Sequence, residues 1–438
     1  MRRAIHIYLS PFEYESRILK EIKTLIDNKI VDEILVVAAW KEGLKGEEII
    51  YPGIQVKRIK LSSLGIVEAV KAIIAKFGVS RKNQRVLAEN HDVQSTAPTG
   101  TFNGPVVDKK PAVSGIKKAA MPFIDGISAV MRTIHGIVTT LQIGYIILAN
   151  KPTFLNIHHV DLLHFAWLKK LSKRMKVIYD THELETETQG SVGLVGFKRR
   201  RKEAKFIVEV DYTIVVTPSI EKWYRDAYGI KNIVTVRNVP LYQDVGNFDK
   251  GYYKTKFNLQ PTDTVFLYQG ALFYGRGIMY LLKSFAAIND PRYSMVFMGY
   301  GEFKDVITEY AEKYSNIFFH DAVSTATILQ HTASADVGVA LTENVCLSYY
   351  YGLGNKIFEY TMAEIPLFVS NMVDMADYVT SNQIGWVADS FEIQDIVDEI
   401  KAIPDRFTPQ IAEKIKKAKL ENNWEIESQK MLEAYRSF

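Results

Sequence analysis

The amino-acid sequence predicts an α/β protein of two domains, each built on a parallel sheet with crossover helices. Its 438 residues exceed what one hydrophobic core usually organises, which favours two domains of about 200 residues each. Short β-branched runs alternate with longer helical patterns in both halves of the chain. The alternation stops between residues 238 and 263, where Pro240 and Pro261 bracket a polar, aromatic stretch. We therefore place the first domain at 1–237, a linker at 238–263, the second domain at 264–418 and a terminal helix at 419–438.

The predicted strands are short apolar runs that each end in a polar residue or a turn. The first half contains AIHIYL, EILVVAA, FLNIHH, KVIYDTH, YTIVVTP and IVTVRNV. The second half contains TVFLYQG, SMVFMGYG, IFFHD, VGVALT, LFVSN and GWVAD. Ligands of open α/β sheets lie outside the carboxyl ends of the strands, so the residues that follow each strand are the candidates for a site.

One segment of the first domain departs from this pattern. Residues 81–115 are rich in Pro, Gly, Ser, Thr and Asn, which predicts a long mobile loop. Two amphipathic stretches flank it, at 64–77 and 116–134. They fit crossover helices that bury an apolar face on the sheet. Alternatively they lie, with the basic run FKRRRKEAK at 197–205, against an anionic membrane surface.

The composition indicates the cellular compartment of the protein and the classes of partner that it binds. The single cysteine, Cys346, excludes an intramolecular disulfide and fits a reducing, cytoplasmic setting. The net charge of +4 is mild and does not predict a nucleic-acid-binding protein. No run reaches the roughly 18 to 20 apolar residues of a membrane-spanning helix. We expect a soluble protein, or one attached to the inner face of the cell membrane.

A glycine-rich turn opens the second domain. In FLYQGALFYGRGIMYLLKSF, a strand is followed by Gly270, Gly275 and Gly277 and then by an apolar-periodic helix. Glycines let the backbone approach a ligand, and the start of a helix presents free N–H groups, so the pattern is typical of an anion site. Arg276 adds a fork of donors suited to a phosphate. A tight β/α turn with a solvent-exposed arginine is the alternative.

Other motifs of nucleotide and metal chemistry are missing from the sequence. It has no G-x-x-x-x-G-K-[ST], no complete G-x-G-x-x-G, no G-x-S-x-G and no Cys/His metal spacing. It also has no D-x-D after a strand that could hold a divalent metal. We expect neither a metal nor a cofactor.

Polar clusters follow two strands of the first domain. His158, His159 and Asp161 follow one strand, and Asp180, His182 and Glu183 follow the next. Two such clusters at successive strand ends favour a site, although a single histidine is usually a structural residue.

The order of these motifs resembles the retaining glycosyltransferases of the GT-B fold, in the large glycosyltransferase family 4-like group that assembles bacterial glycans. The matching motifs are SRILKEIKTL, HHVDLLHFAWLKKL, VIYDTHELE, YQGALFYGRG, GYGE, NKIFEYTMAEIPLFVS and NWEIESQKMLEAYRSF. They span nearly the whole chain in the family's order. Residues 81–115 have no counterpart in it.

The resemblance implies two Rossmann-like domains that face each other across a cleft, with the terminal helix packing back on the first domain. The second domain would bind a nucleotide-sugar, which is a substrate and not a cofactor, and the first a glycan or lipid-linked acceptor. The implied catalytic residues are Arg276 at the diphosphate, Glu359 at the ribose and His182 beside the sugar. Donor contacts are implied at Gly270, Gly275, Gly277, Gly301, Gly354, Asn355 and Lys356. Acceptor contacts are implied at Arg17, His159, Asp161 and Glu183.

The chain differs from many family members at two positions. Tyr351 stands eight residues before Glu359, where many have a second glutamate, and Ala271 stands where many have an arginine. These differences support the alternative of a catalytically silent GT-B subunit that binds a partner glycosyltransferase. A sugar-nucleotide epimerase of the same fold is disfavoured by the FEY pattern and the terminal helix. The leading expectation is retaining, metal-independent glycosyl transfer in the biosynthesis of a cell-surface polysaccharide or glycoconjugate.

Overall fold

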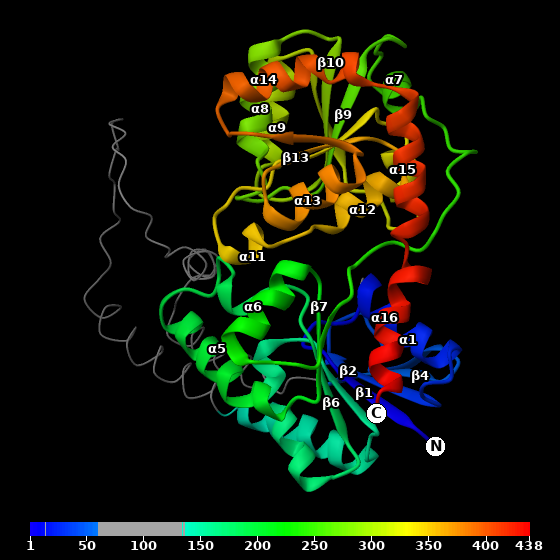
Figure 1. Cartoon of the computed structure of the whole chain (residues 1–438), viewed down its shortest axis with the longest axis vertical. Helices are drawn as coiled ribbons and strands as arrows, with labels where there is room; N and C mark the ends of the chain where they lie inside the picture. Colours follow the sequence, from blue (N-terminus) through cyan, green and yellow to red (C-terminus); the bar gives the residue numbers. More distant parts are fainter. Residues whose placement is uncertain (14, 60–133, 135) are drawn as a thin grey trace, which may run out of the picture.

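The computed structural model describes residues 1–13, 15–59, 134 and 136–438. The predicted loop at 81–115, the stretch at 64–77 and all but the last residue of the stretch at 116–134 lie outside the described residues. Two α/β domains lie one above the other, the first below and the second above in Figure 1.

The first domain is built on an eight-stranded sheet in the order β3-β4-β2-β1-β5-β6-β7-β8. Its strands are β1 (Arg3–Ile7), β2 (Glu33–Ala39), β3 (Glu47–Tyr51), β4 (Ile54–Ile59), β5 (Phe154–Ile157), β6 (Lys176–Asp180), β7 (Tyr212–Val215) and β8 (Ile233–Thr235). All neighbours are parallel except β3 and β4, which form a hairpin. Six of these strands were predicted, and the hairpin was missed.

Helices cover both faces of this sheet. They are α1 (Ser16–Asp27), α5 (Gly193–Phe206), α6 (Pro218–Tyr228) and the 3-10 helices η1 (Val160–Leu171), η2 (Glu185–Glu187) and η3 (Ile207–Glu209), with a further helix at 136–150. Ile18 and Ile22 of α1 pack on one face, and Ile143 and Ile147 pack on the other. Because both faces are covered, the central strands are largely buried and most of their residues are apolar, although His6, Asn156 and Asp180 are buried among them.

The second domain contains a six-stranded, fully parallel sheet in the order β11-β10-β9-β12-β13-β14. Its strands are β9 (Thr264–Ala271), β10 (Tyr293–Tyr300), β11 (Ile317–Asp321), β12 (Val337–Ala340), β13 (Leu367–Ser370) and β14 (Gly385–Ala388). Its helices are α8 (Ile278–Ile288), α9 (Lys304–Lys313), α10 (Ile328–Thr332), α11 (Leu347–Tyr350), α12 (Asn355–Met362), α13 (Val373–Asn382), α14 (Ile393–Ala402) and the 3-10 helix η4 (Pro404–Arg406). All six strands were predicted, and their order is that of a doubly wound nucleotide-binding fold.

The chain crosses between the domains twice. Residues 238–263 contain α7 (Tyr252–Lys256), and the side chains of Val239 and Val245 in this segment are buried, so it packs as part of the core. On the return, α15 (Pro409–Glu421) packs against α12 and α13, and α16 (Trp424–Arg436) packs against α1 and β8. Figure 1 shows these two helices in red, running from the second domain down to the first. No helix among the described residues is long and apolar enough to cross a membrane.

A buried ion pair holds the second crossing in place. Glu427 of α16 accepts from the backbone N–H of Arg237 at 2.9 Å and from its Nη2 at 2.6 Å. Burial opposes ionisation of Glu427, but the Arg237 guanidinium outweighs it and holds the pKa of Glu427 below its ordinary value. The ionised carboxylate therefore stabilises the fold at neutral pH.

We predict that Glu427→Gln lowers the free energy of unfolding by about 1.5 to 3 kcal/mol at pH 7, because it weakens a charge-assisted pair. A carboxylate with a depressed pKa stabilises the folded state above its unfolded pKa and loses that contribution as pH falls through the folded pKa. The difference between variant and wild type should therefore shrink as pH falls below about 4.5. Urea denaturation at several pH values measures this difference.

Glu433→Gln, an exposed change on the same helix, is the control. An equal loss in both variants, or a loss independent of pH, contradicts the prediction.

Candidate functional site

The order of strands reverses once in each sheet, and the two reversal points define where a ligand binds. In the first sheet the reversal lies between β1 and β5, and in the second between β9 and β12. Crevices at the carboxyl ends of such strands are the ligand sites of doubly wound folds. His158 directly follows β5, and Leu341 and Thr342 directly follow β12.

A cavity of about 180 Å³ lies between the domains at these strand ends. The first domain contributes His182, Glu183, Val216 and Ile220, and the second contributes Arg276, Ala340, Thr342, Ser348, Tyr349, Gly352, Leu353, Gly354, Asn355, Lys356 and Met375. Six of the residues predicted from the sequence therefore line one cavity: His182, Glu183, Arg276, Gly354, Asn355 and Lys356.

Hydrogen bonds close the cleft around this cavity. The hydroxyl of Ser348 donates to Glu183 Oε2 at 3.2 Å, and the hydroxyl of Thr217 donates to the backbone oxygen of Tyr351 at 2.8 Å. The side chains of Tyr351 and Leu347 pack against the core of the first domain. Tyr351, where many family members have a glutamate, is thus part of the contact between the domains.

Two cations converge on the cavity without a carboxylate partner in the described part of the chain. The Arg276 guanidinium lies 4.4 Å from the centre of the Tyr349 ring, and Lys356 Nζ lies 3.6 Å from the centre of the Tyr268 ring. Burial, and then the charge of Arg276, hold the pKa of Lys356 well below its ordinary value. Two like charges that disfavour each other in this way indicate a place for a bound anion.

The start of α12 adds backbone donors to the same place. Gly354 is the N-cap of this helix and supplies no side-chain cap. The first N–H groups of a helix lack intrahelical partners and favour an anion. Asn355 and Lys356, the first two residues of α12, line the cavity, so the cations and the helix start act together.

The glycine turn before α8 differs from the prediction in one respect. Gly270, Gly275, Gly277 and Gly301 all have positive φ, and a Cβ on Gly277 would lie 2.0 Å from the Leu341 oxygen. The turn therefore requires glycine. However, the N–H of Gly277 donates to Glu343 Oε1 at 3.1 Å. A carboxylate of the protein thus occupies one of the donors expected to bind the anion, and these four glycines do not line the cavity.

Glu359 lies one helical turn beyond Lys356 on α12. Its Oε2 accepts from Gln269 Nε2 at 2.5 Å, and Gln269 Oε1 accepts from the Thr332 hydroxyl at 2.7 Å. Burial raises the pKa of Glu359, and the bond from Gln269 partly offsets this. The sequence missed Gln269, although a polar side chain inside a buried apolar strand is a signal that could have identified it.

Among the acceptor-side candidates, only Glu183 reaches the cavity. The ring of His159 caps η1 by accepting from the N–H of Asp161 at 3.1 Å, and Asp161 pairs with Arg199 of α5 at 3.0 Å. Arg17 is buried, with Nη2 bonded to Asp180, Nη1 to the Val236 oxygen and Nε near Glu21. Arg17 therefore does not line the cavity, and its donors are engaged inside the protein.

Three side chains of the first domain are close enough to hold a metal ion. His158 Nδ1, Asp180 Oδ2 and His182 Nε2 lie 3.1 to 3.4 Å from one another. Such separations also suit hydrogen bonds between these groups. The sequence indicated all three residues as members of two strand-end clusters.

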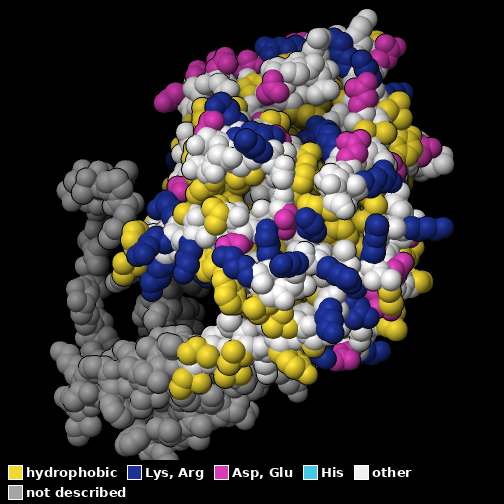
Figure 2. Space-filling model, turned by 60° about the horizontal axis from the view of Figure 1, so that its bottom comes forward, with side chains coloured by type: hydrophobic (Ala, Val, Ile, Leu, Met, Phe, Trp, Pro, Cys, Tyr) yellow, Lys and Arg dark blue, Asp and Glu magenta, His cyan; other side chains and the backbone are white. Residues whose placement is uncertain are grey.

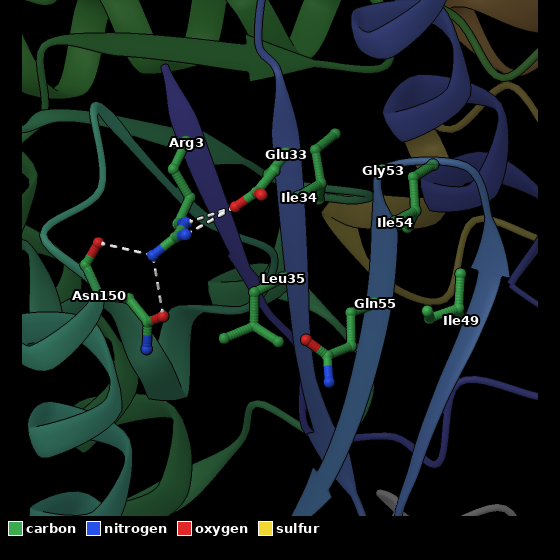
Figure 3. Close-up of a pocket in the computed structure, with 9 residues that line it drawn as sticks. All are labelled: Arg3, Glu33, Ile34, Leu35, Ile49, Gly53, Ile54, Gln55 and Asn150. Carbon is green, nitrogen blue, oxygen red and sulfur yellow. Dashed lines mark hydrogen bonds and ion pairs between the residues drawn. The ribbon is translucent and has the colours of Figure 1, made fainter. Parts of the chain in front are cut away.

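Two other cavities lie away from this site. One of about 280 Å³ lies at the amino-terminal edge of the first sheet, where Arg3 donates to Glu33 at 2.6 Å and to Asn150 Oδ1 at 3.2 Å (Figure 3). Its cation is therefore already neutralised. The other, of about 620 Å³, is lined by Trp223, Tyr350 and Tyr351 on the outer side of the domain contact. Neither cavity brings together unpaired charges.

The sheets and the cleft together define a GT-B fold, and comparison with known proteins agrees. Residues 249–421 match the family model described as "Glycosyl transferases group 1". This match covers the second domain and supports a glycosyltransferase. No curated protein matches the sequence of the chain.

Solved structures show the same fold over the whole chain. Sucrose-phosphate synthase from Thermosynechococcus elongatus is similar, with a TM-score of 0.64 and 12% identity over 100% of this chain and 99% of that one. HepE from Anabaena, in complex with UDP, has a TM-score of 0.61 and 14% identity over 100% of both chains. WaaG, a glycosyltransferase involved in lipopolysaccharide biosynthesis, has a TM-score of 0.55 and 11% identity over 98% of both chains. At these identities the likeness shows the fold.

We predict that binding of a nucleoside diphosphate is accompanied by proton uptake at Lys356. An anion beside this ammonium group raises its depressed pKa, so a fraction of the lysines gains a proton on binding. Calorimetric titration in buffers of different ionisation enthalpy measures the number of protons taken up. Lys356→Met should abolish the uptake and weaken binding about tenfold or more.

Lys313→Met, which removes an exposed lysine of the same domain, is the control and should behave as wild type. Equal proton uptake in all three proteins would show that Lys356 does not contact the anion.

Proposed function

We propose that this protein is a retaining glycosyltransferase that moves a sugar from a nucleotide-sugar to a glycan or lipid-linked acceptor. The observation that carries the proposal is a pair of cations, Arg276 and Lys356, which form no ion pair with any described residue and line one cavity with His182. A diphosphate supplies the missing negative charge. The group 1 family match and the UDP in the HepE structure support a nucleoside diphosphate as that anion.

The donor lies along α12 in this proposal. Its diphosphate contacts Arg276, Lys356 and the first N–H groups of the helix, and its ribose contacts Glu359 one turn further along. Gln269 holds Oε2 of Glu359, which leaves Oε1 for a ribose hydroxyl. The sugar then points across the cleft to His182 and Glu183. A cavity of about 180 Å³ is smaller than the roughly 300 Å³ of ordinary ligand pockets, so it holds the reacting part of the donor only.

Departure of the diphosphate places negative charge where the cations already lie. Fixed charges and dipoles aimed at developing charge are usually the largest contribution to catalysis. With two cations and a helix start at the leaving group, the reaction requires no divalent metal. The acceptor hydroxyl attacks from the face that the leaving group vacates, which retains the anomeric configuration.

A silent subunit remains the second candidate because of one observation. Tyr351 replaces a donor-site glutamate of many family members, and its side chain packs against the first domain. A silent subunit, however, would have no use for two cations that line one cavity and form no ion pair with any described residue. Turnover of a donor distinguishes the two candidates.

A lipid-linked acceptor fits an exposed apolar surface at the start of α5. We name the residues Val192, Leu194, Val195 and Phe197, all exposed, the α5 tip. Figure 2 shows hydrophobic side chains beside a group of Lys and Arg side chains at the left margin of the described surface, where Figure 1 places α5. We propose that the α5 tip contacts an anionic membrane surface on the cytoplasmic side.

Intramolecular pairs reduce the number of cations that can meet the membrane. Arg199 and Lys202 pair with Asp161, and Arg200 pairs with Glu187. Lys198, Arg201 and Lys205 are exposed and form no ion pair with any described residue. Glu203, on the opposite side of the helix, accepts from the hydroxyls of three buried or half-buried tyrosines and anchors α5. The membrane contact therefore rests on fewer basic residues than the sequence suggested.

We predict that Glu359→Ala weakens binding of a free nucleoside diphosphate by about tenfold to a hundredfold, because charge-assisted bonds to ribose hydroxyls are lost. Glu359→Gln keeps one acceptor and should lose less. Titration calorimetry with UDP, GDP and ADP measures both variants without knowledge of the sugar. If the folded wild type binds none of them, the transferase proposal fails. If all three proteins bind equally, Glu359 does not contact the ribose.

The same nucleotides then select the sugar donors for a transfer assay. Turnover should persist in excess chelator, and proton NMR of the product should show the anomeric configuration of the donor. Loss of turnover that Mn²⁺ or Mg²⁺ restores would refute metal independence. Inversion at the anomeric carbon would refute retention.

We predict that Leu194→Ser combined with Phe197→Ser reduces sedimentation with anionic vesicles at low and high salt, because apolar area at the α5 tip is lost. Lys198→Gln combined with Arg201→Gln should instead lower affinity for anionic vesicles by roughly 30-fold at low salt, from about 1 kcal/mol per charge. Ile426→Ser, an exposed change on α16, is the control. Equal recovery of wild type with neutral and anionic vesicles would end this proposal.

A further inference from the structure

The cavity of about 620 Å³ on the outer side of the domain contact has the size of an ordinary ligand pocket. We name it the outer cavity. Its rings and polar side chains come from both domains: Ser219, Lys222, Trp223 and Asp226 of α6, and Tyr350 and Tyr351 at the end of α11. The outer cavity therefore exists only where the two domains meet.

The first-domain wall of the outer cavity is one side of α6. Ser219, Lys222, Trp223 and Asp226 are spaced by three and four residues, so they share one side of the helix. Ile220 and Tyr224 lie on another side and are buried in the core of the first domain. Burial of these two side chains thus fixes which side of α6 faces outward.

The indole of Trp223 is held in place and stays partly exposed. Its ring meets those of Tyr224 and Tyr228 edge-on, with centroids 5.1 and 5.7 Å apart and an interplanar angle of 81° in both pairs. T-shaped contacts of this kind are favourable between aromatic rings. A ring that is already immobilised loses little entropy when a ligand packs on it.

The charges that line the outer cavity cancel each other. Lys222 Nζ lies 2.5 Å from Asp226 Oδ2, one helical turn away, and no other charged residue of the described chain lines this cavity. The two side chains are 77% and 66% exposed, so both can turn to a ligand. In contrast to the cavity at Arg276 and Lys356, the outer cavity offers no surplus charge to an anion.

Aromatic rings beside hydrogen-bonding groups suit a sugar. A pyranose has an apolar C–H face, which packs on an aromatic ring, and a rim of hydroxyl groups, which donate and accept hydrogen bonds. In the outer cavity Trp223 offers the ring, and Lys222 and Asp226 offer a donor and an acceptor. The hydroxyls of Tyr350 and Tyr351 form no hydrogen bond with any described residue, so they are available as well.

The outer cavity shares a wall with the cavity at His182. Ile220 and Gly352 line the cavity at His182, whereas their chain neighbours Ser219 and Tyr351 line the outer cavity. Because adjacent residues face the two cavities, a ligand of several linked sugar units can extend from one to the other.

We propose that the outer cavity binds an uncharged sugar unit of a glycan, with the sugar ring packed on Trp223. That this glycan is the acceptor rests on the proposed function; the binding of the sugar does not. The end of the acceptor then lies beside His182, and a unit further along lies in the outer cavity. The enzyme thereby prefers an acceptor of several linked sugars to a monosaccharide, since only the longer molecule reaches both cavities.

The ring of Trp223 reports sugar binding without any transfer. With 5-fluorotryptophan in place of the five tryptophans, ¹⁹F NMR records a signal from each ring, and Trp223→Phe identifies that of Trp223. Titration with maltotetraose, cellotetraose, mannotetraose and chitotetraose should shift this signal saturably for at least one of them. If none does, the proposal is wrong. A shift that follows protein concentration alone would mean that a second copy of the chain occupies this face, which also overturns the proposal.

Variants test the individual contacts by calorimetric titration with the same tetrasaccharide. Trp223→Ala should weaken binding roughly tenfold, because packing area and the indole donor are lost. Asp226→Ala, an exposed change that removes no packing, should weaken it by a similar factor. Trp167→Ala, which removes a tryptophan of η1 that is 46% exposed, is the matched control and should bind as wild type. Thermal unfolding shows that each variant is folded. Wild-type affinity in both Trp223→Ala and Asp226→Ala contradicts the proposal.

Transfer kinetics separate this inference from the proposed function. With a tetrasaccharide acceptor, Trp223→Ala should raise the acceptor KM about tenfold and leave kcat and the donor KM unchanged, which a merely structural defect does not do. An unchanged acceptor KM overturns this inference and leaves the transferase standing. If the wild type binds a tetrasaccharide at Trp223 but no nucleoside diphosphate, the proposed function fails and the sugar site stands.

Discussion

Arg276 and Lys356 place two basic side chains in one cavity beside the start of α12, and no described carboxylate lies within ion-pair distance of either. Burial, and then the charge of Arg276, lower the pKa of Lys356. The ring of Tyr349 lies against Arg276 and the ring of Tyr268 against Lys356, and each ring face stabilises the neighbouring positive charge. The nearby carboxylates are held elsewhere: Glu343 by the Gly277 N–H, Glu359 by Gln269 and Glu183 by Ser348. The two basic groups thus lack a carboxylate partner among the described residues, and in the proposed function a diphosphate supplies the negative charge.

The rest of the fold determines where Arg276 and Lys356 lie and what faces them. The reversal of strand order between β9 and β12 creates the crevice, and the return of α16 to the first domain sets what faces it. Arg237 and Glu427 link the end of the first domain to α16, and Trp424 Nε1 of α16 donates to Thr24 of α1 at 2.9 Å. Both crossings therefore pack against the domains that they connect.

The sequence predicted the features that depend on local pattern. Buried parallel strands are continuous apolar runs, so all six strands of the second sheet could be found. The hairpin of β3 and β4 was missed because its strands lie at an edge, where exposed and buried residues mix. Its signal was the Pro-Gly turn at Pro52 and Gly53. The internal partners of Arg17 could not be predicted, because a sequence shows that an arginine is present on a helix but not which buried carboxylate engages it.

Under the proposed function, the two domains contact the substrate through different interactions, charge in the second domain and hydrogen bonds in the first. The second domain offers net positive charge, which acts over a distance and tolerates some misalignment. In the first domain, Arg17 neutralises Asp180. The polar groups that line the cavity there are His182 and Glu183, and hydrogen bonds to them require alignment. The cavity of about 180 Å³ is smaller than an ordinary ligand pocket, and the contacts from Ser348 to Glu183 and from Thr217 to Tyr351 lie beside it. Under the proposed function, the charge of the second domain therefore holds the diphosphate, and the polar groups of the first domain contact the sugar.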